Sequence, residues 1–213
     1  MHLPEYVSQL VSVYGYWAVL GLAALESMGV PAPAETMLIG TAIYAAHTHD
    51  MSLALLVAFA AAGAILGDNI GYWIGRRFGY RLLVRYGRYV RLTEPRIKLG
   101  QYLFLRYGSR IVFFGRFVAE VRTFAALLAG VNRMPWRRFL IANAAGGSVW
   151  ATLWGVGGWE LGDRLDRLMG PLGIAIGICA AIAVLALIFT VHRHLARLQA
   201  EADKAFPGPL KPK

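Results

Sequence analysis

The chain has 213 residues, of which 57% are apolar and only 16% charged, and its mean hydropathy is positive at +0.50. This composition excludes an ordinary soluble domain, and the single cysteine, Cys179, excludes an intramolecular disulfide and a cysteine-cluster metal site. A net charge of +10 would suggest nucleic acid in a soluble chain, but placement matters more here, and we expect no nucleic-acid partner. The sequence predicts one polytopic membrane domain over residues 1–195 and a basic tail over residues 196–213.

The first apolar region is interrupted by charge and proline. A long apolar run meets Glu26, Pro31, Pro33 and Glu35, and apolar character then resumes. Limbs of about 10–15 residues extend roughly 15–22 Å as helix, which reaches only the middle of a bilayer. Broken helices survive at membrane depth where protein or a cavity satisfies the freed backbone groups. We therefore predict a re-entrant hairpin over about residues 15–47, with Pro31 and Pro33 as its helix-breaking residues.

A spanning helix and a basic segment follow. Residues 51–75 are long enough to cross a bilayer and carry one charge, Asp68. Residues 76–110 then hold ten of the 22 Lys and Arg residues against one acid, Glu94, near which a short helix is expected to begin. Arginines at helical spacing opposite leucines and tyrosines indicate an amphipathic helix that lies on an anionic leaflet. A solvated basic connector is the alternative interpretation of the same pattern.

A second broken segment precedes two further spanning helices. Residues 111–132 are apolar but carry Arg116, Glu120 and Arg122 at their centre, which predicts a second re-entrant hairpin. Two uncharged runs of 21 residues each are long enough to span a bilayer, at residues 139–159 and 171–191.

The distribution of positive charge predicts the topology. If the second broken segment returns to its own side, 18 of the 22 Lys and Arg residues fall on one face, which the positive-inside rule makes cytoplasmic. The basic segment 76–110 and the C-terminus then lie in the cytoplasm, and the N-terminus on the periplasmic side. If the segment crossed instead, Arg133, Arg137 and Arg138 would lie opposite the basic segment. The hairpin interpretation is therefore favoured.

Glycine spacing suggests an internal repeat. Ala61-Ala62-Gly63 is followed by Gly75 and Gly79, and Ala144-Ala145-Gly146 by Gly158 and Gly162 at the same intervals. We predict an all-α polytopic membrane protein of two inverted repeats, each a re-entrant hairpin plus a transmembrane helix, with an additional C-terminal transmembrane helix. Coincidence among packing glycines is the alternative. Glycines at positions 71, 75 and 79 suggest a homo-oligomer, although they would equally suit packing within one protomer.

Six ionisable residues in the membrane region form the candidate site: Glu26, Glu35, Asp68, Arg116, Glu120 and Arg122. Intramembrane charges are costly, so they usually pair or face a cavity. Four acids against two arginines favour at least one carboxyl group that exchanges a proton, and a guanidinium suits a phosphate because its planar fork makes two hydrogen bonds. The alternative is that the arginines only neutralise the acids and hold the hairpins together. Asp68 could equally brace its own helix.

The sequence favours transport over catalysis. No nucleophile lies beside a histidine base, no zinc or phosphate-loop motif is present, and His47 with His49 is too small a set to indicate a metal. We expect no enzyme activity, no cofactor and no metal.

Three ordered motifs resemble the DedA family, also called SNARE-associated or VTT-domain membrane proteins. The motifs run from Glu26 to Glu35, from Gly67 to Gly75 and from Gly115 to Phe124, and the resemblance covers roughly residues 10–195. It implies a bacterial inner-membrane protein with two re-entrant hairpins that flips or recycles lipids, including undecaprenyl phosphate and phosphatidylethanolamine, in dependence on the proton motive force. The sequence departs from the family at Ala119-Glu120, where Pro-Gly is common, and at Ala126, where proline is common.

The resemblance also implies roles for single residues. Glu26 and Glu35 match the family's essential acids, and Arg116 and Arg122 match its essential arginines. The hypothesis is a flippase in which the two arginines bind a lipid phosphate, the two glutamates couple a proton, and undecaprenyl phosphate is the favoured substrate. The alternatives are a phosphatidylethanolamine flippase or scramblase, a proton-coupled transporter of a small anion, and an assembly factor whose charges are structural.

Overall fold

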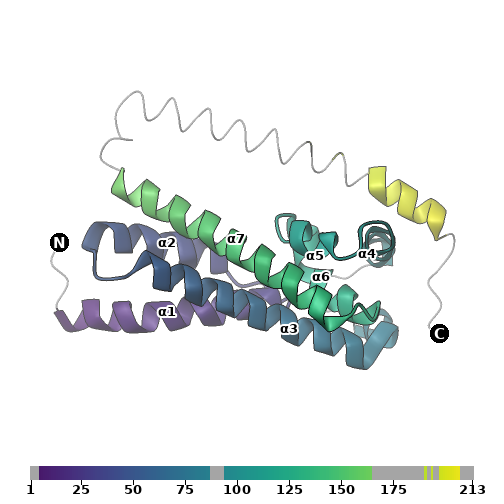
Figure 1. Cartoon of the computed structure of the whole chain (residues 1–213), viewed down its shortest axis with the longest axis horizontal. Helices are drawn as coiled ribbons and strands as arrows, with labels where there is room; N and C mark the ends of the chain where they lie inside the picture. Colours follow the sequence, from purple (N-terminus) through teal and green to yellow (C-terminus); the bar gives the residue numbers. More distant parts are fainter. Residues whose placement is uncertain (1–4, 87–93, 165–189, 191–192, 194–196, 207–213) are drawn as a thin grey trace.

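The computed structural model describes residues 5–86, 94–164, 190, 193 and 197–206, and the regular elements in that part of the chain are all helical (Figure 1). The helices are α1 (Glu5–Ser27), α2 (Ala34–Thr48), α3 (Leu53–Tyr86), α4 (Glu94–Tyr107), α5 (Arg110–Gly115), α6 (Ala119–Val131) and α7 (Trp136–Asp163). The spanning helix expected at residues 171–191 lies outside the described residues, as does most of the tail apart from residues 197–206, of which 197–205 are helical.

Two helices are long and apolar enough to cross a bilayer, at residues 53–79 of α3 and along the whole of α7. Helices are therefore present where the sequence predicts them at 51–75 and 139–159, with α3 beginning at Leu53 and α7 at Trp136, and the crossing of a bilayer stays a prediction. α3 continues to Tyr86 through a kink at Gly79, whose φ of +60° is a conformation that glycine adopts without strain. The short helix expected near Glu94 is α4. The described part of the chain is therefore helical, and helices satisfy their backbone hydrogen bonds internally, as a lipid environment requires.

Four of the remaining helices pack on these two, and α4 packs on α5 and α6. α1 lies along α3 and α2 along α7, while α6 packs on α3 and α5 on α7 (Figure 1). One apolar core forms between α1, α2, α3 and α7 around the buried Leu38 and Leu56. A second core surrounds Tyr72 and Phe139, whose rings stack with centroids 4.5 Å apart. The Tyr72 hydroxyl donates to the Met134 carbonyl oxygen, which ties α3 to the turn before α7.

Both predicted interruptions are present as helix breaks. α1 ends before Gly29, whose φ is +99°, and α2 begins after Pro33. The predicted limb length is wrong for α1, which has 23 residues, because nothing between Glu5 and Gly29 stops a helix. The second break, residues 116–118, forms although Ala119 and Glu120 replace the proline and glycine common in the resembled family. Extended backbone at Val118 supplies the break instead.

Glycines let the helices approach closely, and they do so in the same way in both halves. A Cβ at Gly63 would overlap a backbone oxygen of α1, and one at Gly146 would lie 3.3 Å from a backbone oxygen of α5. Twelve residues later, a Cβ at Gly75 would overlap a backbone oxygen of α6, and one at Gly158 would lie 2.9 Å from a backbone oxygen of α2. Each long helix thus contacts the first limb of one broken segment and the second limb of the other. The predicted repeat and its inverted topology stay predictions.

Two of the three glycines considered for oligomer contacts face other helices of the same chain. A Cβ at Gly71 would lie 3.5 Å from the Ala126 side chain of α6, and Gly75 faces the Leu127 carbonyl. Gly79 forms the kink in α3. Gly71 and Gly75 therefore pack inside the protomer, whereas a Cβ at Gly79 would meet no described atom within 4 Å, and the homo-oligomer stays a prediction.

Gly67→Ala is expected to destabilise the fold. The added Cβ would overlap the Ala24 carbonyl oxygen, so α1 must move away from α3, at a cost of about 1–3 kcal/mol. Gly21→Ala is the matched control, because its Cβ would meet no atom of the described residues within 4 Å and alanine favours a helix by about 1 kcal/mol over glycine. Thermal unfolding of both variants in detergent measures the difference. Equal melting temperatures would contradict the close approach of α1 and α3.

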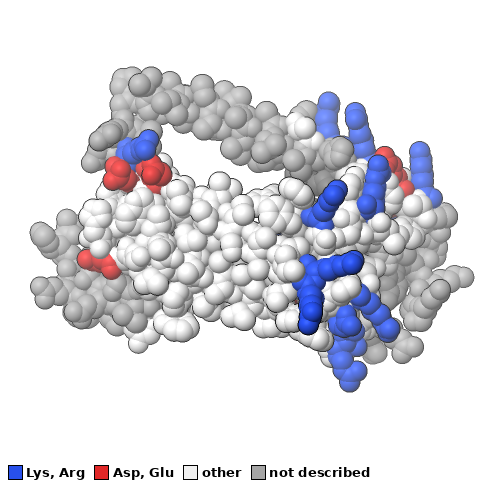
Figure 2. Space-filling view, in the orientation of Figure 1, with Lys and Arg blue, Asp and Glu red and all other residues white. Residues whose placement is uncertain are grey.

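Positive charge gathers at one end of the molecule, where α3 finishes and α7 begins (Figure 2). Arg76 joins these two ends by donating to the Tyr72 hydroxyl at 2.7 Å and to the Met134 carbonyl at 3.2 Å. On the same side of the fold, Arg106 of α4 pairs with Glu201 at 2.9 Å. The described arginines before and after the second broken segment therefore lie at the same end of the helix bundle.

Candidate functional site

The first helix break is held by a carboxylate. Glu26, in the last turn of α1, accepts a hydrogen bond at 2.9 Å from the backbone N–H of Ala34, the first residue of α2. α2 has no side-chain cap of its own at Pro33, so Glu26 satisfies one of its free N–H groups from across the break. Glu35 follows in the first turn of α2, where the helix dipole favours a negative charge. The break therefore gathers two carboxylates at one helix start.

Arg122 joins the two helix breaks. It is the fourth residue of α6, and its Nη1 lies 2.6 Å from Glu35 Oε1 while its Nη2 donates to Glu26 Oε1. The side chains of Arg122 and Glu26 are 18% and 15% exposed, whereas that of Glu35 is 39% exposed. One guanidinium thus uses its fork on two carboxylates, and Glu35 is the most accessible member of the group.

A second, buried ion pair lies beside the first. Arg116, at the end of α5, has its Nη2 2.6 Å from Asp68 Oδ2 of α3, and the two side chains are 4% and 11% exposed. The same nitrogen lies 3.4 Å from the Ser27 hydroxyl oxygen. Arg116 Nη1 is buried and has no hydrogen-bond partner among the described residues, which is costly for a guanidinium and marks a place where a further acceptor fits.

Trp150 connects the two ion pairs. Its indole N–H donates to Glu35 Oε1 at 3.3 Å, and the Arg116 guanidinium carbon lies 5.9 Å from the centroid of its ring. Between the pairs is a cavity of about 10 Å³, room for about one water, lined by both arginines, Glu26, Ser27 and Trp150. The two arginines therefore share one small polar space at the junction of the helix breaks.

The structure brings together five of the six predicted ionisable residues. Glu26, Glu35 and Arg122 form one group, and Asp68 pairs with Arg116 rather than with its own helix. With all five ionised, the net charge of the cluster is −1. The side chain of Glu120 lies outside the described residues, although its backbone is the second residue of α6. Pro31 and Pro33 lie in the first break and are exposed, as helix-breaking residues there should be.

The sequence interpretation missed the residues that complete the site. Trp150 lies in the middle of α7, whereas tryptophan is usually enriched at membrane interfaces. Its position in the sequence therefore indicates that the indole N–H has a polar partner inside the protein. Gly147, one turn earlier, lies where a Cβ would meet Arg116 Nη1 at 3.4 Å. Ser27 carried no indication beyond its place next to Glu26.

Comparisons with known proteins identify the family of this chain. The family model of the VTT domain matches residues 31–160, which is more than half of the chain and contains Glu35, Asp68, Arg116 and Arg122. The chain belongs to the DedA family of VTT-domain membrane proteins. No solved structure matches it.

Relatives of this DedA-family protein come from distant bacteria. It is 41% identical over 150 residues to the uncharacterized membrane protein slr0232 of Synechocystis, covering 70% of this chain and 68% of the relative. It is 39% identical over 196 residues to the uncharacterized membrane protein Rv2637 of Mycobacterium tuberculosis, covering 87% and 88%. It is 28% identical over 211 residues to protein DedA of Escherichia coli, covering 96% and 95%. These relatives therefore match most of the length of the DedA-family membrane protein.

Proposed function

We propose that this DedA-family protein is a lipid flippase that moves a phosphate-bearing headgroup across the bacterial inner membrane, with undecaprenyl phosphate as the favoured substrate and the proton motive force as its drive. The observation that carries the proposal is Arg122 held between Glu26 and Glu35 at the junction of two helix breaks. Helix interruptions at membrane depth with charged groups beside them are where transporters place their substrate sites.

Competition for Arg122 supports proton coupling. While Glu26 and Glu35 are ionised, the fork of Arg122 is occupied and the cluster is net negative, so an anionic headgroup is disfavoured. Protonation of both glutamates changes the net charge from −1 to +1 and leaves Arg122 N–H groups without an ionic partner. A phosphate then has two arginines to bind, because Arg116 Nη1 also has no acceptor in the described part of the chain.

The small size of the cavity supports a gated site. Its volume of about 10 Å³ admits one water but no phosphate, so binding requires the elements around it to separate. The ends of α1 and α5 and the starts of α2 and α6 adjoin a break in the helical hydrogen bonding, whereas Ala64 of α3 and Trp150 of α7 line the cavity from continuous helices. Breaks of this kind provide the hinges that such a motion needs.

The charge distribution supports an orientation in the membrane. We place the arginine-rich end of Figure 2 in the cytoplasm, where the basic segment 76–110 contacts the anionic leaflet, and the N-terminal end of α1 on the periplasmic side.

The proposal is tested by headgroup translocation in proteoliposomes. Undecaprenyl phosphate and phosphatidylethanolamine are assayed separately, each with and without a pH gradient. Movement of undecaprenyl phosphate that follows the gradient is the expected result. Gradient-independent movement of both lipids would identify a scramblase instead, and movement of neither, with uptake of a soluble anion, would identify an anion transporter.

Glu35→Gln is expected to uncouple transport from the gradient. The amide keeps the size of the side chain but removes one negative charge from Arg122, which mimics protonation permanently. Gradient-driven transport should fall about tenfold, because an amide cannot take up the coupled proton. Binding of undecaprenyl phosphate at neutral pH should strengthen, because a charge-assisted hydrogen bond that contributes roughly 1.5–3 kcal/mol no longer occupies Arg122. Glu160→Gln, at an exposed acid of α7, is the control. Unchanged gradient dependence in the Glu35 variant would remove that residue from the coupling mechanism.

A further inference from the structure

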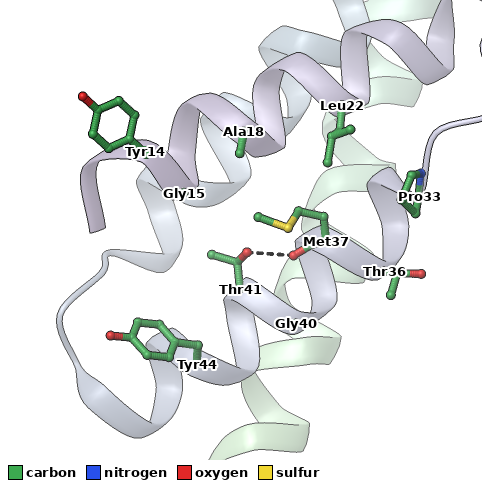
Figure 3. A pocket seen from close by; sticks show the side chains of 10 residues that line it. All are labelled: Tyr14, Gly15, Ala18, Leu22, Pro33, Thr36, Met37, Gly40, Thr41 and Tyr44. Carbon is green, nitrogen blue, oxygen red and sulfur yellow. Dashed lines mark hydrogen bonds between the residues drawn. The ribbon is translucent and has the colours of Figure 1, made fainter. Parts of the chain in front are cut away.

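An apolar groove runs between α1 and α2 (Figure 3). Its volume is about 680 Å³, and its walls are formed by one face of each helix, from Tyr14 and Tyr44 at one end to Leu22 and Pro33 at the other. The groove exists because α1 packs mainly on α3 and α2 on α7, so the two limbs contact each other little. The hydroxyl of Thr41 faces the groove but donates to the Met37 carbonyl, which leaves the lining almost entirely apolar.

The dimensions of the groove suit a hydrocarbon chain. The α2 wall from Pro33 to Tyr44 is about 16 Å long, about half of a hydrocarbon core of roughly 30 Å, and therefore one leaflet deep. Spread over that length, the volume gives a mean cross-section of roughly 40 Å², whereas a helix 10–12 Å in diameter needs about 80–110 Å². At the outer end, Tyr14 is 64% exposed, as is typical of a tyrosine at the membrane–water interface.

No charged residue lines the groove, but its inner end lies on the same turn of α2 as one member of the charged cluster. Pro33 and Thr36 line the groove, and Glu35, between them in sequence, contacts Arg122 and is the most exposed of the three residues in its group. A lipid with its phosphate at Arg122 therefore has an apolar path for its chain beginning within one turn of α2. Charge at one end and an apolar channel along one leaflet match the two parts of such a lipid.

We propose that this groove holds the hydrocarbon chain of the transported lipid while its phosphate is at Arg122. This inference rests on the proposed function and adds where the chain lies during transport. The groove keeps the chain in the leaflet on the side away from the arginine-rich end of the molecule, so that only the headgroup has to move through the protein. The groove also favours lipids whose hydrocarbon chain can bend next to the phosphate and enter the space beside Thr36.

Gly40 offers a way to fill the groove without disturbing the fold. A Cβ at Gly40 meets no atom of the described residues within 4 Å, and Gly40 lines the groove, so Gly40→Trp places an indole in the proposed chain site. Gly21→Trp is the matched control, since Gly21 is a helical glycine outside the groove lining whose Cβ would likewise meet no described atom within 4 Å. Both variants should melt within a few degrees of the wild type in detergent, as substitutions into open space do.

The decisive measurement is photolabelling in vesicles of phosphatidylethanolamine and phosphatidylglycerol. The probe is an isoprenyl phosphate with a diazirine in its chain, and labelled peptides are identified by mass spectrometry. We expect labels on α1 and α2 in the wild type and in Gly21→Trp, competition by unlabelled isoprenyl phosphate, and a loss of at least about tenfold in Gly40→Trp.

Several results would overturn the inference. Labelling that Gly40→Trp does not reduce, or that added phosphatidylcholine displaces as well as isoprenyl phosphate does, would make the groove a place for bulk lipid. Cross-links between two protein chains through the groove residues would make it an interface between copies. The proposed function is judged separately: translocation without labelling of the groove rejects only the chain site, and competitive labelling without translocation rejects only the transport.

Discussion

Arg122→Ala is expected to abolish headgroup translocation in proteoliposomes while the protein still folds. The substitution removes the side chain that contacts both Glu26 and Glu35, which is also the more exposed of the two guanidinium groups in the cluster. A charge-assisted bidentate contact of roughly 3 kcal/mol corresponds to a loss of at least about a hundredfold. The fold should tolerate the change, because both glutamates are partly exposed and can take up water or a proton.

Two further variants sharpen this measurement. Arg122→Lys keeps the charge but loses the planar fork, so translocation should fall to an intermediate level. Arg164→Ala removes an exposed arginine that pairs with Glu160 on the surface of α7, and transport should be unchanged. Full translocation by Arg122→Ala would refute its assigned role. A sharp fall in its melting temperature, reversed by exchanging Glu35 and Arg122, would assign the cluster a structural role instead.

Asp68→Ala is expected to produce the largest loss of stability of any single change at the site. It leaves the Arg116 guanidinium, whose side chain is 4% exposed, without its ionic partner, and breaking a buried pair in this way costs about 3–5 kcal/mol. Thermal or denaturant unfolding in detergent measures the loss. The double variant Asp68→Leu with Arg116→Met should recover most of it, because removing both charges leaves none unpaired.

An exposed acid provides the comparison for Asp68. Asp163→Ala changes a solvent-exposed side chain at the end of α7, and its effect should stay within about 0.5 kcal/mol. If Asp68→Ala were equally mild, the buried pair would not contribute to the fold. If the double variant were as unstable as Asp68→Ala, the cost would come from lost packing rather than from the unpaired charge.

The charged residues of the site could be predicted from the sequence because intramembrane charges are rare, but their pairing could not. Arg116 and Arg122 are six residues apart, one in the second break and one in the first turn after it, and nothing in that spacing says which acid each of them meets. The partners lie far away along the chain: Glu35 is 87 residues from Arg122, and Asp68 is 48 residues from Arg116. Rotation of α3 and α6 about their axes decides the pairing, and rotation depends on contacts such as that between Gly75 and the Leu127 carbonyl.

The two helix breaks differ in how well the residues within them predict the break. Gly29, Pro31 and Pro33 mark the first break unambiguously, because each disfavours continuation of a helix. The second break has no such residues after Arg116, and only its charges and the family resemblance predict it. The predicted first limb is shorter than α1, because the prediction follows the apolar run, which begins at residue 11. Polar residues before that point do not end a helix, so α1 begins earlier.

Glu26 divides its two carboxylate oxygens between different tasks. Oε1 accepts from Arg122, and Oε2 accepts from the backbone N–H that begins α2. A proton bound to either oxygen turns that acceptor into a donor, so the ion pair and the helix cap cannot both survive it. The first turn of α2 contains Glu35 and Thr36, and it frays more easily once its cap is lost. Protonation of one side chain thereby changes the order of the backbone, because the same carboxyl group both binds the proton and caps the helix.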